Sequence, residues 1–456
     1  MLFKKTICFI LSAVTLAGAT CSVTVSAATH PKLLAGDADC DGKITVDDVT
    51  AIQMHLAALK GLGEQELLLA KNYFPDEGLT INDATNIQLY LSEFYDKQTR
   101  EVGMPALIWY KNKYFPATQE YQRFLDDLMA KSNLSGTVYI TRNGRLLCAA
   151  SNGNESGGEM ISSKTLFPIG SDSKFFCATA IMMLKEQGKL SVDDKLEKYF
   201  PEYEIGKDVT IKNLLMMRSG IRDHVNFDNS YPDSNYPIDC YFDKLSTEQT
   251  AAENKRAILD WLFTQKLKFT PDSSYSYSNS NFLLLSEIVE VVSGITYADF
   301  IKKNIFEPLD MTSSGFYEEL VDEPNLAESN IEKEYLLEPY YHGVAQGAGD
   351  IVSNAIDMDK WMTSFNEYSL LSKESFDEMT TKQGKSTYGY GITIMANGCL
   401  NHGGAITSYQ SFVEFYPAEN YNFFIVTNDP QGLAETNRTV ESITGNLINK
   451  IGVPKR

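Results

Sequence analysis

The stretch "PIGSDSKFFCATAIMMLKEQGKL", residues 168–190, decides how the sequence is interpreted. It predicts a single helix that carries no charged side chain between Phe175 and Leu184. A helix that is apolar on every side is expected to be buried on every side. Ser171 and Lys174 stand at positions i and i+3 where the apolar run begins, so they share one helix face. A hydroxyl and an amine one turn apart could exchange a proton, or the pairing could be coincidence.

Runs with strand-like alternation lie on both sides of this stretch. Residues 136–141 and 145–151 are joined by Asn143-Gly144, which is typical of a tight hairpin. Three more runs, "YGYGITIM", "SFVEFY" and "NFFIVTN", lie toward the other end of the chain. We expect helices from Thr118 and over 438–451 to cover the sheet. The sequence therefore predicts an α/β fold: an antiparallel five-stranded sheet built from both chain ends, flanked by helices, plus a helical lobe.

The first 27 residues have the form of a secretory signal peptide. Two lysines precede an apolar segment that is too short to span a bilayer, and small residues follow it. Cys21 raises a lipoprotein alternative, but the preceding "GAT" lacks the usual leucine. We expect a secreted, extracellular protein with no transmembrane segment, whose hydrolase part is monomeric.

Composition excludes several classes of function. The net charge is −20, and removal of residues 1–27, with Lys4 and Lys5, would make it −22. Such a chain repels phosphate backbones, so we expect no nucleic-acid partner. Its seven cysteines form no C-x-x-C pair and its five histidines do not cluster, so a zinc site is not expected. We expect catalysis to need no cofactor.

An acidic loop near the amino terminus predicts a calcium site. In "GDADCDGKITVDD", residues 36–48, carboxylates alternate around a turn glycine in the spacing of a calcium-binding loop. The alternative is an acidic turn that only faces solvent. The expected ligands are Asp37, Asp39, Asp41, the carbonyl of Lys43, and Asp48.

The helix expected at 46–56 has a second copy further along the chain. "ITVDDVTAIQMHLA" at 44 aligns with "LTINDATNIQLYLS" at 79, an offset of 35 residues. Together the copies resemble a type I dockerin over residues 33–95, followed by a connector at 96–117. The resemblance implies a small all-α calcium-binding module that docks on a cohesin of a scaffoldin, as in cellulosomes. In the second copy Phe74 and Glu77 replace a ligand and the turn glycine, which leaves a second calcium open.

Three separated motifs in the larger part of the chain carry its chemistry. They are Ser171-x-x-Lys174, Tyr277-Ser278-Asn279 and His402-Gly403-Gly404. Alone, the second fits a polar turn that caps a helix, and the third fits a glycine turn before a strand. In this order they resemble the serine β-lactamase and penicillin-binding protein superfamily, in its class C-like branch with esterases and D-stereospecific peptidases. The resemblance covers residues 118–452.

Burial and resemblance together predict the catalytic roles. A lysine in an apolar site has a lowered pKa, so Lys174 could act as a neutral base toward Ser171, the predicted nucleophile. The resemblance implies that Tyr277 is a partner base and later proton donor, and that Asn279 orients the substrate and Lys174. It also implies an oxyanion hole formed by the backbone N–H groups of Ser171 and Ala405.

The third motif and one long loop concern the substrate. His402 stands where many β-lactamases carry a lysine, which shifts the prediction from β-lactams toward esters or peptides. Gly403 and Gly404 are expected beside the substrate. The loop 222–247 is either a solvated flap or a part of the substrate site, in which case His224 and Tyr231 would contact the substrate.

The sequence thus predicts a secreted, scaffold-attached serine hydrolase that cleaves an ester or amide through a Ser171 acyl-enzyme, in a setting of polysaccharide degradation. A D,D-peptidase or β-lactamase that acts on cell-wall peptides or β-lactams is the first alternative. A non-hydrolytic, β-lactamase-like binding module is the second.

Overall fold

The computed structural model divides the chain into two compact units, residues 1–118 and 119–456, each of which is described by itself. The predicted signal peptide, most of the second acidic loop, the connector up to residue 116 and the predicted helix at 438–451 lie outside the described residues. The described residues are 34, 36–39, 41, 43–62, 70, 79, 81–91, 117–132, 134–142, 144–225, 250–329, 343–382, 386–406, 409–418 and 420–428.

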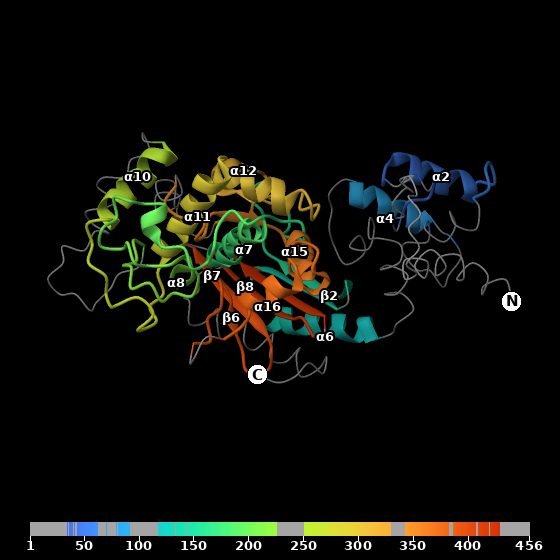
Figure 1. Ribbon diagram of the computed structural model, residues 1–456. Coiled ribbons are helices and arrows are strands. Elements are labelled where there is room, and N and C mark those ends of the chain that lie inside the picture. Colours follow the sequence, from blue (N-terminus) through green and yellow to red (C-terminus); the bar gives the residue numbers. More distant parts are fainter. Residues whose placement is uncertain are drawn as a thin grey trace, which may run out of the picture. The chain divides into compact units, whose positions relative to one another are not determined.

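Two helices of equal length form the described core of the small unit (Figure 1). They are α2 (Val46–Leu56) and α4 (Ile81–Leu91), and they pack against each other. Helix α2 begins at a capping box in which Thr45 and Asp48 satisfy each other's backbone N–H groups. Both predicted helices are confirmed, and small and branched apolar side chains fill the space between them. The fully buried ones include Ala38, Ile52, Ala70, Ala84 and Ile87.

A six-stranded antiparallel sheet forms the centre of the large unit, in the order β2-β1-β9-β8-β7-β6 (Figure 1). Strands β1 and β9 pair in register from Gly136 opposite Thr427 to Arg142 opposite Tyr421. The prediction that both chain ends build one sheet is therefore confirmed. The strands are β1 (Gly136–Arg142), β2 (Arg145–Asn152), β6 (Thr393–Ile394), β7 (Leu400–Ile406), β8 (Tyr409–Tyr416) and β9 (Tyr421–Thr427). A smaller sheet contains β3 (Phe167–Pro168), β5 (Ile351–Ser353) and β4 (Gly315–Phe316) in that order.

Both faces of the central sheet are covered, which explains the unbroken apolar run of β9. Phe423 and Ile425 pack on one face with the helix α6 (Ala117–Ser132), whereas Phe424 and Val426 belong to the core of the helical lobe. Successive residues of a strand point to opposite faces, so every position of this central strand is apolar or enclosed. The other helices that the described residues of the large unit form are α7 (Ser173–Glu186), α8 (Ile211–Leu215), α10 (Ala251–Leu262), α11 (Asn279–Ser293), α12 (Tyr297–Ile301), α13 (Tyr317–Leu320), α15 (Ala355–Glu367) and α16 (Lys373–Met379).

The central sheet has six strands and not the five that were predicted. The additional strand is β7, which contains the His-Gly-Gly motif that was expected to form a turn. The strand β7 runs through residues 402–404 and pairs along its whole length with β8. Glycines lack the apolar alternation that marks a strand, so the motif looked like a turn. The run "YGYGITIM" supplies only the two-residue strand β6.

The helix expected over 168–190 begins five residues later than the pattern indicated. Pro168 belongs to β3, and Gly170 opens a short 3-10 turn with φ +50, a left-handed conformation that glycine tolerates. The helix α7 therefore starts at Ser173. Every residue from Ser173 to Leu184 is buried, so the expectation of a helix enclosed on all sides is confirmed.

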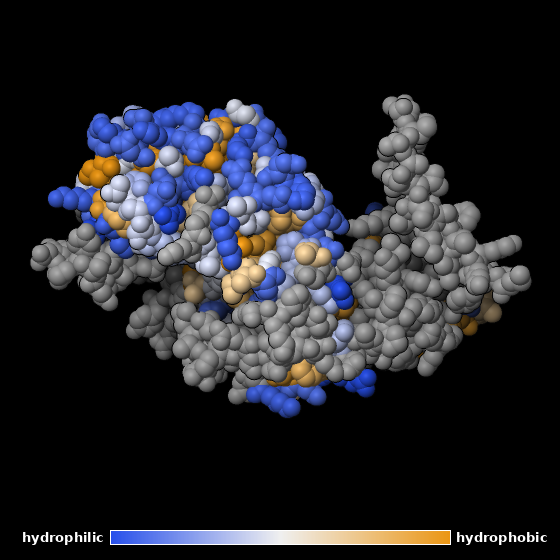
Figure 2. All heavy atoms as spheres, turned by 60° about the horizontal axis from the view of Figure 1, so that its bottom comes forward, coloured by the Kyte–Doolittle hydropathy of each residue, from blue (hydrophilic) through white to orange (hydrophobic). Residues whose placement is uncertain are grey.

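Surface character fits the acidic composition. Figure 2 shows one face of the molecule, on which hydrophilic residues cover most of the coloured surface and hydrophobic residues form small separate areas. Among the helices within the described ranges, none is both long and apolar enough to cross a bilayer.

Close packing of β7 on the turn before α7 predicts unequal tolerance at the two glycines of the motif. A Cβ on Gly404 would lie 1.9 Å from the carbonyl oxygen of Ile169, whereas the nearest heavy atom to a Cβ on Gly403 lies at 3.7 Å. We expect Gly404→Ala to lower the free energy of unfolding by about 1–3 kcal/mol, as overpacked sites do. Thermal denaturation followed by circular dichroism measures this loss. Gly403→Ala is the matched control, and equal melting temperatures for the two variants would contradict the close contact between Gly404 and Ile169.

Candidate active site

Ser171 lies on the 3-10 turn Gly170–Asp172, at the point where this turn enters α7. Its side chain is partly exposed, while the residues around it are buried. Gly170 packs against β7: a Cβ there would lie 3.0 Å from the backbone nitrogen of Ala405. The turn, the helix and the sheet edge therefore meet at the Ser171 hydroxyl.

Lys174 is fully buried and its amine contacts three oxygens. The Nζ atom lies 3.0 Å from Ser171 Oγ, 2.7 Å from Asn279 Oδ1 and 2.7 Å from the carbonyl oxygen of Ala348. Burial lowers the pKa of Lys174 from 10.5 to about 7, against the opposing attraction of Asp223 and other acidic groups. Near neutral pH the amine is therefore present in both its charged and its neutral form.

The identity of these three oxygens determines where the neutral amine would direct its lone pair. A protonated amine has three hydrogens and can donate one to each oxygen. After losing one proton it keeps two, and the carbonyl oxygens of Asn279 and Ala348 can only accept. Ser171 Oγ alone carries a hydrogen that it can give. The lone pair then faces Ser171, which is the arrangement that a general base requires.

Asp223 fixes the orientation of the Asn279 amide. The Asn279 Nδ2 atom donates to both carboxylate oxygens of Asp223, at distances of 3.2 and 3.0 Å, so Oδ1 must point to Lys174. Asn279 is the first residue of α11, and Asp223 is buried. The sequence did not indicate Asp223, because 56 residues separate it from its partner and no local pattern connects the two.

Tyr277 completes the group around the serine. Its hydroxyl donates to Ser171 Oγ at 2.9 Å, and its ring lies 4.9 Å from Lys174 Nζ. Burial raises the pKa of Tyr277 further above its usual value, so this side chain is a phenol at neutral pH. The geometry favours Lys174 over Tyr277 as the base in the free enzyme, while Tyr277 holds a proton that it can donate.

His402 lies inside β7 and is buried as a neutral imidazole. Its Nδ1 lies 2.9 Å from the carbonyl oxygen of Gly403, which can only accept, so Nδ1 carries the hydrogen. Its Nε2 therefore accepts a hydrogen bond from the Tyr388 hydroxyl, at 2.9 Å. Burial, with the nearby positive charge of Lys174, lowers the pKa of His402 to about 3. A fixed positive charge is thus not available from this residue, and Tyr388 is a second neighbour that the sequence did not indicate.

The residues predicted to form the oxyanion hole and to contact the substrate differ in their exposure. Ala405 and Gly403 are exposed on β7, and Gly404 is buried between them. His224 is buried: its Nδ1 contacts Ser280 Oγ at 2.9 Å and its Nε2 contacts the carbonyl oxygen of Val344 at 2.8 Å. Both ring nitrogens of His224 are thus occupied within the protein, which favours a structural role over substrate contact. Tyr231 lies outside the described residues.

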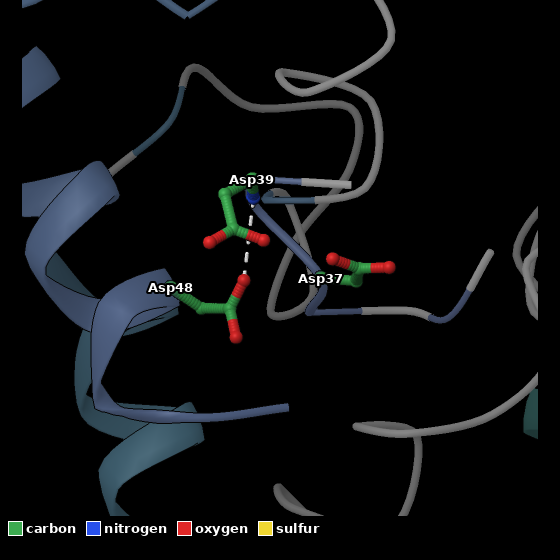
Figure 3. A group of neighbouring side chains, drawn as sticks. All are labelled: Asp37, Asp39 and Asp48. Carbon is green, nitrogen blue, oxygen red and sulfur yellow. Dashed lines mark hydrogen bonds between the residues drawn. The ribbon is translucent and has the colours of Figure 1, made fainter. Parts of the chain in front are cut away.

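The small unit holds a separate cluster of carboxylates, drawn in Figure 3. Oxygen atoms of Asp37, Asp39 and Asp48 all lie within 4.8 Å of one another, and Asp37 and Asp48 are fully buried. Asp48 Oδ1 also accepts the backbone N–H groups of Ala38 and Asp39, which folds the loop over the start of α2 (Figure 3). Asp41 Oδ1 accepts the backbone N–H of Lys43 at 2.8 Å. Three of the predicted ligands are therefore together, and an all-oxygen set suits calcium.

Known proteins resemble the large unit. The family model described as Beta-lactamase matches residues 121–444. PbpX of Bacillus subtilis (strain 168), named as a penicillin-binding protein, is 31% identical over 291 residues, which cover 63% of this chain and 68% of that protein. The teichoic acid D-alanine hydrolase of Staphylococcus aureus (strain MRSA252) is 26% identical over 306 residues, covering 64% and 70% respectively.

Solved structures share the same architecture. The penicillin binding protein from Bacillus halodurans has 25% identity and a TM-score of 0.59, over 70% of this chain and 99% of that one. The D-amino acid amidase from Ochrobactrum anthropi SV3 has 21% identity and a TM-score of 0.58, over 74% and 99%, and at that identity it supports the fold alone.

The lowered pKa of Lys174 predicts the pH dependence of acylation. The neutral amine becomes available as pH rises through about 7, so the rate of acylation should rise with a midpoint near pH 7, whereas an ordinary lysine would give no such limb there. Stopped-flow acylation by an activated ester across the pH range measures the midpoint. Lys174→Arg keeps the charge, cannot act as a base, and should abolish this limb together with most of the rate.

The variant Asp223→Asn tests independently whether the acid limb belongs to Lys174. It removes the acidic group that does most to raise the pKa of Lys174, so the midpoint should move to lower pH. A midpoint that stays in place in Asp223→Asn, or a Lys174→Arg variant that acylates as fast as the wild type, would contradict the assignment of this limb to Lys174.

Proposed function

The chain belongs to the Beta-lactamase family, and from this premise we propose that it hydrolyses an ester or amide through an acyl-enzyme on Ser171. It is a serine hydrolase of that family, so the alternative of a non-hydrolytic binding module is no longer needed. One observation carries the proposal: Ser171 Oγ lies within hydrogen-bonding distance of both the Lys174 amine and the Tyr277 hydroxyl. A base and an acid on one nucleophile are what acyl transfer requires.

The acylation step follows from this arrangement. The neutral amine of Lys174 takes the proton of Ser171 while Oγ attacks the carbonyl carbon of the substrate. The oxyanion that forms is expected to lie toward the backbone N–H groups of Ser171 and Ala405. As the bond to the leaving group breaks, Tyr277 donates its proton to the departing oxygen or nitrogen, and the Lys174 ammonium returns a proton to Tyr277. Atoms and charges balance, and the neutral amine is restored.

Hydrolysis of the acyl-enzyme can use the same groups in reverse order. A water molecule at the position vacated by the leaving group gives its proton through Tyr277 to Lys174 and attacks the acyl carbon. Collapse of the second oxyanion returns the proton to Ser171 Oγ. Asp223 and Asn279 keep the Lys174 lone pair directed at Ser171 for the acylation step.

The charge of the site indicates the class of acyl group. His402 is neutral where many related enzymes carry a lysine, so this position does not attract a substrate carboxylate. An aminoacyl ester, such as a D-alanyl ester, presents an ammonium group and no free carboxylate. The similarity to the teichoic acid D-alanine hydrolase of Staphylococcus aureus supports this class, and acyl esters on polysaccharides share the same absence of carboxylate.

A D,D-peptidase or β-lactamase activity is the second candidate. The penicillin-binding protein PbpX of Bacillus subtilis supports it through 31% identity. Substrates of this kind carry a carboxylate near the scissile bond, and the neutral His402 disfavours them.

The small unit is proposed to be a calcium-dependent dockerin. The family match begins at residue 121, so this proposal rests on the loop and on the helix pair of the small unit. Val46 and Ile81 occupy equivalent positions in the two copies, and 67% and 55% of their surfaces are exposed. Such a repeated apolar position at the start of each helix suits a cohesin surface. Attachment to a scaffoldin and secretion through residues 1–27 belong to the same proposal.

The substrate proposal predicts a ranking of activities. We expect D-alanyl and acetyl esters to react with kcat/KM values at least about tenfold above those of D-Ala-D-Ala peptides and nitrocefin, a difference of about 1.4 kcal/mol. Steady-state assays on this panel, with feruloyl esters included, measure the ranking. Ser171→Ala should remove both turnover and labelling by a fluorophosphonate. If nitrocefin proved the best substrate, the D,D-peptidase or β-lactamase function would be favoured over the esterase function. If Ser171→Ala were still labelled, Ser171 would not be the nucleophile.

The loop predicts one calcium ion for each chain. Isothermal titration of the full chain should give one binding event, because the second loop has lost a ligand and its turn glycine. Asp39→Asn should weaken this binding about tenfold or more, since it removes a ligand carboxylate. Asp47→Asn is the matched control, because Asp47 lies in the first turn of α2 but outside the cluster. Absence of calcium binding to the wild type would remove the proposed metal site.

A further inference from the structure

Asp172, the residue that follows the nucleophile, is a buried acid with an unusual set of partners. Its Oδ2 atom lies 2.5 Å from Ser411 Oγ on β8. Among the described residues, no hydrogen-bonding partner reaches its Oδ1 atom. The side chain is enclosed between the Ser171 turn, β7 and β8. A carboxylate in such a place would need either a counter-charge or several donors.

Two oxygens lie within hydrogen-bonding distance of the Ser411 hydroxyl, which has a single hydrogen. Ser411 Oγ also lies 2.7 Å from the carbonyl oxygen of Ile169, which can only accept. A hydroxyl has one hydrogen, and if it goes to Ile169, the contact between Ser411 and Asp172 needs a hydrogen from Asp172. The short chain then runs from the acid of Asp172 to Ser411 and from Ser411 to Ile169.

The titratable groups that face Asp172 do not offer a counter-charge in the reactive enzyme. The nearest imidazole nitrogen, His402 Nδ1, lies 3.8 Å from Asp172 Oδ1 and donates to Gly403 instead. Lys174 must be neutral to act as a base, and Tyr277 and Tyr388 are phenols. The strand β8 faces Asp172 with the uncharged Ser411.

We propose that Asp172 is a protonated carboxylic acid that donates to Ser411, and that this neutral chain positions the nucleophile turn against β8. The inference rests on the proposed function, because its consequence concerns acylation of Ser171. A negative charge one residue from the nucleophile would oppose the oxyanion that develops there, whereas a neutral acid does not. Burial raises the pKa of Asp172 to about 8, in agreement with the hydrogen count.

Ionisation would reverse the chain and weaken the reaction. Ser411 would turn its hydrogen toward the carboxylate, and the carbonyl oxygen of Ile169 would keep only the longer hydrogen bond from the backbone N–H of Asp172, at 3.3 Å. Acylation should therefore fall as pH rises through about 8, which gives the pH profile an alkaline limb that belongs to Asp172. Asn has an amide N–H in place of the acid O–H and does not ionise, so it imitates the neutral form.

The test compares two uncharged replacements of similar size. Asp172→Asn keeps a donor to Ser411 and should lose the alkaline limb, whereas Asp172→Leu has no donor and should acylate about tenfold or more slowly than Asp172→Asn. Single-turnover acylation across the pH range measures both. Asp359→Asn is the control for loss of an acid elsewhere: Asp359 on α15 accepts from Thr141 and Asn422, and its variant should keep both limbs. Equal rates for Asn and Leu, or an alkaline limb that persists in Asp172→Asn, would overturn the proposal.

A spectroscopic measurement separates this inference from the question of activity. The infrared difference spectrum between wild type and Asp172→Asn should contain the carbonyl stretch of a protonated carboxylic acid at pH 6. This band should disappear as pH rises through about 8. A carboxylate band at pH 6 would overturn the proposal even in an active enzyme, and a protonated band in an enzyme with no esterase activity would overturn only the proposed function.

Discussion

The burial of one amine is the constraint on which the large unit depends. Lys174 lies at the start of a helix whose first twelve residues are all enclosed, so its charged form is disfavoured by the protein that surrounds it. Three oxygens surround the amine, and among the described residues no carboxylate bonds to it directly. Asp223 acts through the Asn279 amide. A direct ion pair would hold the proton on the amine, whereas the relay lets the amine give it up near neutral pH.

The groups around Ser171 also carry little charge. His402 is neutral, and the proposal for Asp172 makes that acid neutral too, so the reacting serine is surrounded by polar groups that carry hydrogens but little net charge. Such groups can orient toward a developing oxyanion without first releasing strong partners. In the reactive form, in which Lys174 is neutral, a positive charge develops on the amine as it takes the proton of Ser171, which is when the oxyanion forms.

Local patterns in the sequence were sufficient for the helix α7, the hairpin of β1 and β2, and the pairing of the two chain ends. They were sufficient because each of these features produces a recognisable residue pattern within a short stretch of sequence: an unbroken apolar run, an Asn-Gly pair, or alternating apolar residues. The strand β7 shows no such local pattern, since Gly404 is required by the close approach of Ile169 and not by a turn. Asp223, Tyr388 and Ser411 could not be predicted for another reason: their partners lie 56, 14 and 239 residues away in the chain, and no local pattern connects them.

The pairing of β1 with β9 also governs how the enzyme is made. Thr137 lies opposite Val426, so the central sheet closes only after synthesis has passed Val426. Long-range pairing of this kind is slow, and the early strands remain exposed until their late partners arrive. β7, which the Ser171 turn packs against, belongs to that late segment. The nascent protein therefore lacks a complete active site while it is being synthesised. Ser171 becomes reactive only when the fold is complete.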